Sequence, residues 1–405
     1  MAVVSFLAAR AAPTGGFWIG LAGGVAVARV AERRGLRCGF GASIAAMLET
    51  VAIIGPARFG IPLTQALTAP MLGRLEARGW GTFAQTLVCA LVRLVHNAAT
   101  TAFFIWVIAG GLDAYAGTYD ALGRRLGLEI GTADALALTG AGLVGWAAFA
   151  SVVQVLVYRR GLAGWDAAAA DATDVSRNYS GKRKPRDAEG GAGEGGDVRR
   201  RPFDPRAVAL AGAVAFTLLL ASTSWPLLAA VAAWLALAWG AARPDTEPLP
   251  AGLLFAAILA GGALLFSLGG GLGLDTALRR ASRAALLVMV ATWLRGAAGA
   301  EGLREVSRRA LGRLQRLPAA REAGAVLGEI ASEGGRLTAS ARALIDRLQG
   351  VARRPVPFLD AVLGWVVAES SGFRAPAPAA RLALRVRVRD VALIATAAAP
   401  VLALV

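Results

Sequence analysis

Long apolar segments separated by short clusters of arginine constrain this chain more than any other feature. No charged residue occurs in residues 135–157, 208–221, 225–241 or 253–268. A helix that crosses the hydrocarbon core of a bilayer needs about 20 mainly apolar residues. Within lipid, a helix satisfies its own backbone hydrogen bonds, which an open strand cannot do. The sequence therefore predicts an all-α, polytopic integral membrane protein.

The balance of charge indicates how such a protein is oriented. The chain is 56% hydrophobic, and its 43 Lys and Arg residues outnumber 27 Asp and Glu residues, for a net charge of +16. In a membrane protein, excess basic residues indicate loops on the cytoplasmic side and contact with anionic lipids. The aromatic residues interleaved with basic grooves that bind nucleic acid are missing, so no nucleic-acid partner is predicted. We expect a multi-pass protein of the cell inner membrane.

One polar segment divides the chain. Residues 161–204 are rich in glycine and mixed charge, a composition that cannot bury a core, so they are predicted to form a flexible cytoplasmic linker. The linker separates a domain at residues 1–160 from a second domain at residues 205–405, and we expect two separate helical bundles. The first is predicted to contain six helices, at residues 3–12, 17–30, 40–54, 59–72, 83–111 and 135–157.

The second half combines spans with an amphipathic region. Further spans are predicted at residues 281–294 and 391–405, in addition to the three uncharged segments named above. Residues 301–350 are rich in arginine, and their apolar residues recur at helical spacing. Such helices lie at a membrane surface or pack on a partner. We therefore predict amphipathic cytoplasmic helices within residues 301–375.

Several ionisable residues fall inside predicted spans. Placing such a side chain in the hydrocarbon core of a membrane costs free energy, so a functional role is the default interpretation. Glu49, Arg58, Arg93 and His96 meet this description. A structural ion pair of Glu49 with Arg58 or Arg93 is an equally good interpretation. A lone histidine such as His96 is more often a core residue with its hydrogen bonds satisfied than a ligand.

Sequence motifs for catalysis are missing from the chain. It contains no G-x-x-x-x-G-K-[ST], G-x-S-x-G or H-E-x-x-H pattern. Two cysteines and one histidine give no metal-ligand spacing. We predict no enzyme activity, no cofactor and no metal site.

The second half resembles a known family. Its first span is preceded by Asp204-Pro205-Arg206, and a later span is entered through LDTALRRASRAALLVMVATW. The amphipathic region has the sequence GLREVSRRALGRLQRLPAAREAGAVLGEIASEGGRLTASARALIDRLQG. The chain closes with ESSGFRAPAPAARLALRVRVRD and an apolar tail, so that Asp390 is expected to start the last helix. Residues 204–405 thus resemble the transmembrane coupling component of energy-coupling factor transporters, the family that includes the cobalt-transport Q protein. The first half is similar to a substrate-capturing S component in helix count and size.

The resemblance implies a membrane subunit of an uptake transporter for a vitamin or metal ion, coupled to separate ATPase subunits. An S component binds its small-molecule substrate under outward-facing loops, here the loop with Asp113, Tyr115, Tyr119 and Asp120. The predicted substrate-binding residues are Thr14, Glu49, Arg58, Gln65, Arg93, His96, Asn97, Asp113, Tyr115 and Tyr119. The alternative is a membrane scaffold that keeps the coupling fold without transport.

The ATPase-docking turns depart from the family pattern. Family members use Ala-Arg-Gly turns, and the matching positions here are Leu348-Gln349-Gly350 and Ser370-Ser371-Gly372. Both glycines are present and both arginines are absent, so we expect ATPase contact to be weak, or carried by Arg347, Arg353 and Arg374. The predicted coupling residues are Arg347, Gln349, Gly350, Ser371, Gly372 and Phe373.

Overall fold

A computed structural model of the protein describes residues 1–11, 16–56, 63–180, 202–330, 334–351, 354–371 and 386–403. These residues form helices and no strand. Six of the described helices are long and apolar enough to cross a membrane: α3 (Leu36–Ile54), α5 (Thr82–Phe103) with η2 (Phe104–Ala109), α7 (Thr132–Ser180), α9 (Trp225–Ala242), α10 (Leu249–Gly269) and α11 (Leu274–Arg313). The prediction of an all-α, multi-pass membrane protein is confirmed.

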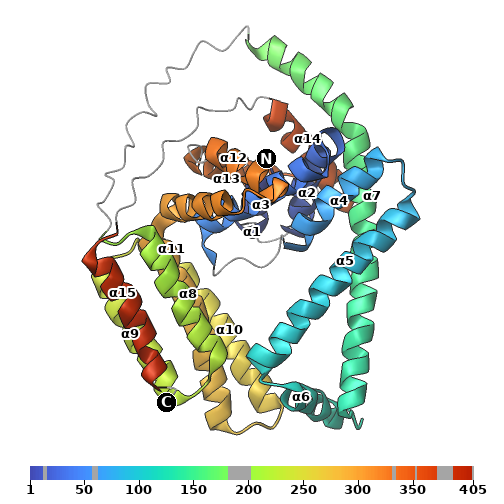
Figure 1. Ribbon diagram of the computed structural model, residues 1–405. Helices are drawn as coiled ribbons and strands as arrows, with labels where there is room; N and C mark the ends of the chain where they lie inside the picture. The colour runs from blue at the N-terminus through green and yellow to red at the C-terminus, as the bar shows by residue number, and fades with distance from the viewer. Residues whose placement is uncertain are drawn as a thin grey trace.

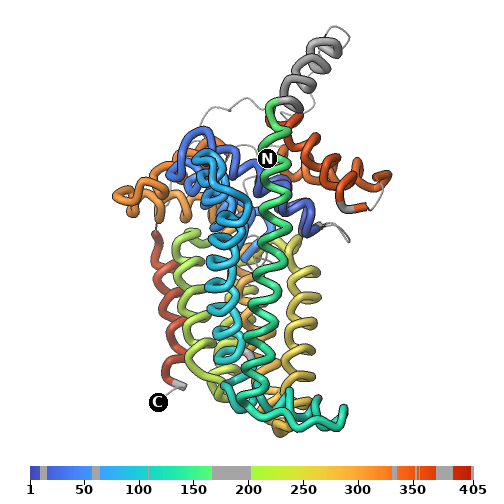
Figure 2. The backbone as a smooth tube through the Cα atoms, turned by 90° about the vertical axis from the view of Figure 1, so that its right-hand side faces the viewer, coloured from blue at the N-terminus to red at the C-terminus, as the bar shows by residue number. Residues whose placement is uncertain are grey.

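The long helices are arranged in two groups that meet at one end (Figure 1). One group consists of α8 (Pro205–Ala221), α9, α10, the first part of α11 and α15 (Val388–Ala398). The other is the pair α5 and α7, and the short helix α6 (Leu112–Arg125) lies where this pair meets α10. Viewed from the side, these long helices run next to one another (Figure 2).

A second set of helices gathers at the opposite end and forms a layer that we call the crosswise layer (Figures 1 and 2). Within it, α12 packs along α3, α13 along α1, and α14 against α2 and α7. The members of the crosswise layer are α1 (Ala2–Ala11), α2 (Gly16–Arg34), α3, α4 (Leu63–Ala77), α12 (Pro318–Ile330), α13 (Gly334–Leu348) and α14 (Pro355–Ser371).

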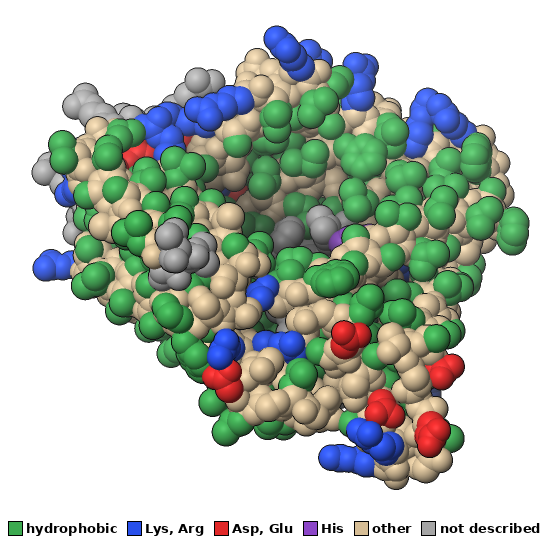
Figure 3. Space-filling model, turned by 60° about the horizontal axis from the view of Figure 1, so that its bottom comes forward, with side chains coloured by type: hydrophobic (Ala, Val, Ile, Leu, Met, Phe, Trp, Pro, Cys, Tyr) green, Lys and Arg blue, Asp and Glu red, His purple; other side chains and the backbone are tan. Residues whose placement is uncertain are grey.

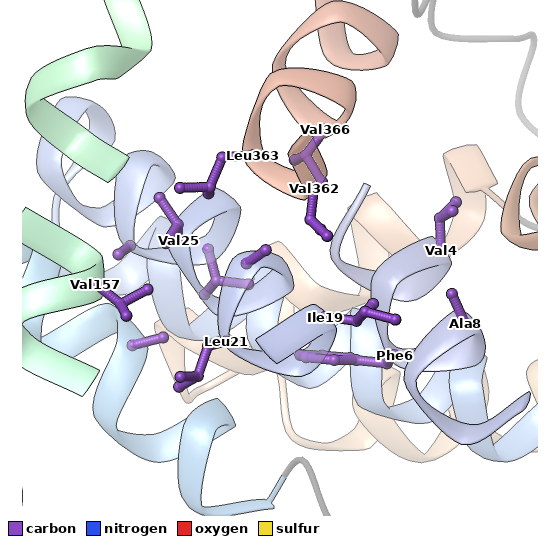
Figure 4. Packing of buried hydrophobic residues seen from close by; sticks show 14 of the residues in the cluster. Val4, Phe6, Ala8, Ile19, Leu21, Val25, Val157, Val362, Leu363 and Val366 are labelled. Carbon is purple, nitrogen blue, oxygen red and sulfur yellow. The ribbon is translucent and has the colours of Figure 1, made fainter. Parts of the chain in front are cut away.

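The two halves of the chain share a hydrophobic core in this layer. Ile19 and Val25 of α2 are buried together with Val362, Leu363 and Val366 of α14 (Figure 4). Burial of such side chains contributes about 1.5–3 kcal/mol each. The expectation of two separate bundles therefore does not describe this arrangement, because part of the core of each half is supplied by the other.

The six helices predicted in residues 1–160 correspond to α1, α2, α3, α4, α5 and α7, but not all of them are long and apolar enough to span a membrane. Only α3, α5 and α7 of this region meet the length and apolarity of a span. The helix α1 has 10 residues and α4 has 15, while α2 ends in Arg33 and Arg34. These helices belong to the crosswise layer, where neighbouring helices cover their apolar faces.

The predicted linker begins as a helix. The helix α7 continues to Ser180, through the alanine-rich sequence that follows Arg160. Alanine has the highest helix propensity, so this extension needs little tertiary support. The rest of the predicted linker, residues 181–201, lies outside the described residues.

A bend in α11 connects the two parts of the fold. Gly299 has φ 64° and ψ 169°, a backbone conformation that is essentially restricted to glycine. Before it, residues 274–298 pack with α8, α9 and α10, and after it, the chain turns into the crosswise layer and contacts α12 and α3. The predicted change from a span to an amphipathic helix near residue 301 falls at this bend.

Asp390 ties the starts of α8 and α15 together. It is fully buried, and its Oδ1 accepts a hydrogen bond of 2.8 Å from the backbone N–H of Asp204. Its Oδ2 accepts another of 2.6 Å from the backbone N–H of Arg387. The Asp-Pro-Arg opening and the Arg-Asp ending, both singled out in the sequence, therefore meet in space. Asp390 was predicted to start the last helix; it lies in the first turn of α15, which begins two residues earlier at Val388.

Replacement of Asp390 with asparagine is expected to lower the free energy of unfolding by about 2 kcal/mol, because hydrogen bonds to a charged acceptor are lost or weakened. Urea unfolding of the purified protein in detergent, followed by tryptophan fluorescence, measures this change. Asp113→Asn is the matched control, since Asp113 is exposed. An equal effect of both substitutions would show that Asp390 does not hold the two helix starts together.

Candidate functional site

A buried polar cluster lies between α4, α5 and α7. We call it the Arg93 cluster, and it comprises Thr68, Cys89, Arg93 and Gln154. The Nη2 group of Arg93 donates to Oε1 of Gln154, whose Nε2 donates to Oγ1 of Thr68 at 2.8 Å. The Cys89 thiol donates to the same Oε1 at 3.4 Å. All four side chains are buried between apolar helices.

The hydrogen-bonding capacity of the Arg93 cluster is incompletely used. Arg93 Nε, Ser151 Oγ and Tyr158 OH are buried and have no hydrogen-bond partner among the described residues. No carboxylate forms an ion pair with Arg93 in the part of the chain that the structure describes. Buried polar groups without partners are costly, so they mark a place where a polar ligand or water would be stabilised.

A second feature is a hollow of about 600 Å³ beside α6, which we call the α6 hollow. Its walls include Tyr115 and Tyr119 of α6, Thr139 of α7, Phe104 of η2 and Phe266 of α10. The Tyr115 hydroxyl lies 3.1 Å from that of Tyr119 and 2.8 Å from Thr139 Oγ1. Aromatic walls with a few converging hydroxyl groups are typical of sites that bind small organic molecules.

Burial raises the pKa of Tyr115, and its hydrogen-bonded neighbour Tyr119 adds to this effect, although the bond with Thr139 opposes it. The phenol therefore stays neutral at physiological pH. The Tyr115 ring also stacks on Phe266, with 6.0 Å between the ring centroids. The α6 hollow consequently offers neutral hydroxyl groups and aromatic faces to a ligand.

The predicted substrate-binding residues do not converge on one pocket. Tyr115 and Tyr119 line the α6 hollow, whereas Arg93 lies in its own cluster. Asp113 is exposed and does not line the hollow. Thr14 and Arg58 lie outside the described residues.

Glu49 pairs across the two halves of the chain, with a residue that the sequence analysis did not consider. Arg304 Nε lies 2.8 Å from both carboxylate oxygens of Glu49, and Arg304 Nη2 lies 2.7 Å from Oε1. Glu49 is fully buried and Arg304 is 8% exposed. The proposed pairing with Arg93 is wrong, because Arg93 bonds to Gln154 instead. The ion pair joins α3 to the part of α11 that follows Gly299.

The remaining predicted residues occupy the inner surfaces of helices. Gln65 is buried and Asn97 is half-buried, and neither Oε1 of Gln65 nor Nδ2 of Asn97 has a hydrogen-bond partner in the described ranges of the chain. His96 is half-buried, one helical turn from Arg93. Viewed from the end opposite the crosswise layer, the molecule is hollowed at its centre, and the chain's single histidine lies at the wall of this hollow (Figure 3).

The first predicted ATPase-docking turn lies at an exposed edge of the crosswise layer. Arg347, Gln349 and Gly350 are all exposed at the end of α13. Ser371 ends α14. The other predicted coupling positions, Gly372 and Phe373, and the candidate arginines Arg353 and Arg374 lie outside the described residues.

Two residues of these sites were missed by the sequence analysis. Gln154 was detectable, since Ser151, Gln154 and Tyr158 recur at helical spacing on one face of an otherwise apolar segment. Arg304 carried no such signal, because it is one of many arginines in an amphipathic region.

Among the described residues, no group of three or more His, Cys, Asp or Glu side chains is placed to hold a metal ion. Comparisons with protein-family models, with curated proteins and with solved structures found no match. The class of protein that the structure itself defines is thus a multi-pass, all-α membrane protein with a crosswise helical layer at one end.

Proposed function

We propose that this protein is the membrane subunit of an energy-coupling-factor-like uptake transporter that works with separate ATPase subunits. The observation that carries the proposal is the crosswise layer. In it the helices α12, α13 and α14 of the second half pack against α3, α1 and α2 of the first half, and the Gly299 bend joins them to a membrane span. Movement of the exposed edge of such a layer would be transmitted to both halves of the chain.

The helices α3 and α12 are in close contact, as transmission of movement between the two halves of the chain requires. A Cβ atom at Gly41 would lie 2.5 Å from Cβ of Glu322 and 3.1 Å from the backbone nitrogen of Ala323. Ala45 and Ala323 are buried in the same contact. Small residues allow helix backbones to approach closely, as they do at helix interfaces within membranes. Densely packed protein interiors transmit strain. Movement of α12 would therefore be passed on to α3.

The α6 hollow favours an organic substrate, such as a vitamin, over a metal ion. Its lining combines aromatic rings, neutral hydroxyl groups and the aliphatic side chains of Leu138 and Leu143. It lies far along the long helices from the crosswise layer (Figure 1). Metal ions prefer carboxylate, imidazole or thiolate ligands, which do not line this hollow. A substrate bound there and an ATPase at the layer would occupy opposite ends of the same molecule.

The distribution of charge supports an inner-membrane protein whose crosswise layer lies on the cytoplasmic side. Arg33, Arg34 and Arg347 lie on its helices, and basic residues concentrate on the cytoplasmic side of membrane proteins. The exposed residues Phe83, Leu87 and Leu91 follow one face of α5, where they would contact lipid tails.

The test is copurification of the full chain with its candidate ATPase subunits, combined with ATP hydrolysis. Arg347→Glu is expected to weaken ATPase retention by about tenfold or more, since a charge-assisted hydrogen bond contributes about 1.5–3 kcal/mol. Arg342→Glu, an exposed arginine of the same helix, is the matched control and should leave retention unchanged. Tight binding that is indifferent to Arg347 would show that the docking surface has been misidentified.

A second candidate function is a membrane scaffold that keeps the coupling fold without transport. It is favoured by the replacement of the family's arginine at both docking turns, where Gln349 and Ser371 stand here. If no ATPase copurifies from native membranes while other proteins do, the scaffold is the better proposal.

A further inference from the structure

Two arginines on the first part of α11 have no carboxylate partner among the residues that the structure describes. Arg280 and Arg283 are three residues apart, so they lie on the same face of the helix. Arg283 is only 6% exposed. Its Nε and the Nη1 of Arg280 are buried and have no hydrogen-bond partner within the described part of the chain. Neither arginine forms an ion pair with a carboxylate of the described residues.

The nearest acidic residue in the sequence does not neutralise them. Asp275 pairs with Arg279, at 2.5 Å between Oδ2 and Nη2, and also accepts a hydrogen bond from the Trp225 indole. The segment from 275 to 283 therefore carries three arginines and one aspartate. An arginine that served only to hold helices together would be expected to have such a partner, because unpaired buried charges are unfavourable.

The half-buried side chain of Arg280 packs closely against the end of η2. Its guanidinium lies against Gly110 at the end of η2, where a Cβ atom would be 2.1 Å from Nη2 and 2.4 Å from Cζ. Gly110 has φ 81°, in the left-handed region that favours glycine. The approach of Arg280 to η2 thus depends on glycine at this position. The guanidinium is directed toward the α5 side of the molecule instead of away from it.

Basic side chains lie beside the central hollow at this end of the molecule. Figure 3 shows the hollow from this side, with basic side chains next to it and both acidic and basic side chains farther toward the edge of the molecule. Guanidinium groups bind carboxylate and phosphate oxygens through pairs of parallel N–H···O hydrogen bonds. Two guanidinium groups on one helix face would supply several such donors to one ligand.

We propose that Arg280 and Arg283 form a binding site for an oxyanion, a phosphate or carboxylate group, between α11 and the end of η2. The same chemistry is present in a lipid head group and in a soluble anion. The site is separate from the α6 hollow and does not depend on the transport proposal.

The test uses the full chain purified in a neutral detergent. In one arm, the thermal unfolding midpoint is followed while sodium phosphate replaces sodium chloride at constant ionic strength. In the other, the protein is placed in phosphatidylcholine nanodiscs with or without phosphatidylglycerol. Wild type should be stabilised in at least one arm. The Arg280→Gln/Arg283→Gln double variant should bind about tenfold to a hundredfold more weakly.

Arg125→Gln removes one positive charge from an exposed position on α6 and should respond like wild type. This control matters because phosphate also stabilises proteins by exclusion from their surface. In the absence of anion, the double variant should unfold no earlier than wild type, since it loses two unpaired charges. If it does not fold, Arg283→Lys keeps the charge but loses the guanidinium fork, and it should show the weakened response.

A response to phosphate in detergent would assign the site to a soluble anion, and a response only to phosphatidylglycerol would assign it to a lipid head group. Two results would overturn the proposal. One is a wild-type protein that responds in neither arm. The other is equal stabilisation of wild type and of the arginine variants.

Discussion

Replacement of Glu49 with alanine is expected to lower the free energy of unfolding by about 3–5 kcal/mol, because it leaves Arg304 buried without a counter-charge. The same size of effect is expected for Arg304→Ala. Unfolding in urea, monitored by tryptophan fluorescence in detergent, measures both. The pair joins α3 to the second part of α11, so the loss should also loosen the crosswise layer.

The double variant Glu49→Leu/Arg304→Met distinguishes a specific pair from two independent contributions. Apolar replacements of similar volume for a buried ion pair are often neutral or stabilising, so this variant should unfold near the wild-type midpoint. Glu329→Gln, at an exposed position on α12, is the control for loss of a carboxylate. If the two single effects simply add in the double variant, the residues do not interact in the folded protein.

The second large effect is expected for Gly41→Leu, which should separate α3 from α12. A Cβ atom at this position already lies 3.1 Å from the backbone nitrogen of Ala323, and backbone cannot move aside as a side chain can. Overpacking of a tight contact typically costs about 1–3 kcal/mol, and we expect the upper end of that range. If the transport proposal is correct, substrate-stimulated ATP hydrolysis should also fall.

The matched control is Gly328→Leu on α12, since nothing lies within 4 Å of a Cβ at that glycine. A disulfide cross-link between cysteines introduced on the facing surfaces of α3 and α12 reports the contact directly, in a background without the native cysteines. It should form in the control and be lost in Gly41→Leu. Efficient cross-linking in both variants would mean that α3 and α12 tolerate the added volume, and the proposed rigid contact would be refuted.

Both predictions concern contacts between the first and second halves of the chain, where the proposed coupling would take place. The ion pair of Arg160 with Asp360, at 3.0 and 2.9 Å, joins the halves at a third point between α7 and α14. This pair is half-exposed, so it contributes little to stability. The buried core of the crosswise layer and the Glu49–Arg304 pair are therefore the contacts on which the arrangement depends.

Some features of the protein were determined by the sequence alone because they depend on local physics. Apolar length predicted the long helices α9 and α10, and helical periodicity predicted the amphipathic region after residue 301. The carboxylate of Asp390 at the positive end of a helix predicted where α15 begins. Each of these follows from residues that are neighbours in the chain.

Tertiary structure alone decided where α1 to α4 lie and which residues face one another. Hydropathy cannot distinguish a helix that is apolar because it crosses lipid from one that is apolar because other helices cover it. The helix α3 qualifies as a span by composition, yet half of its most apolar window is buried inside the protein. Glu49 and Arg304 are 255 residues apart, and no local pattern connects them. Their pairing follows only from the packing of the second part of α11 against α3. A buried carboxylate is stable only where the fold brings a cation to it.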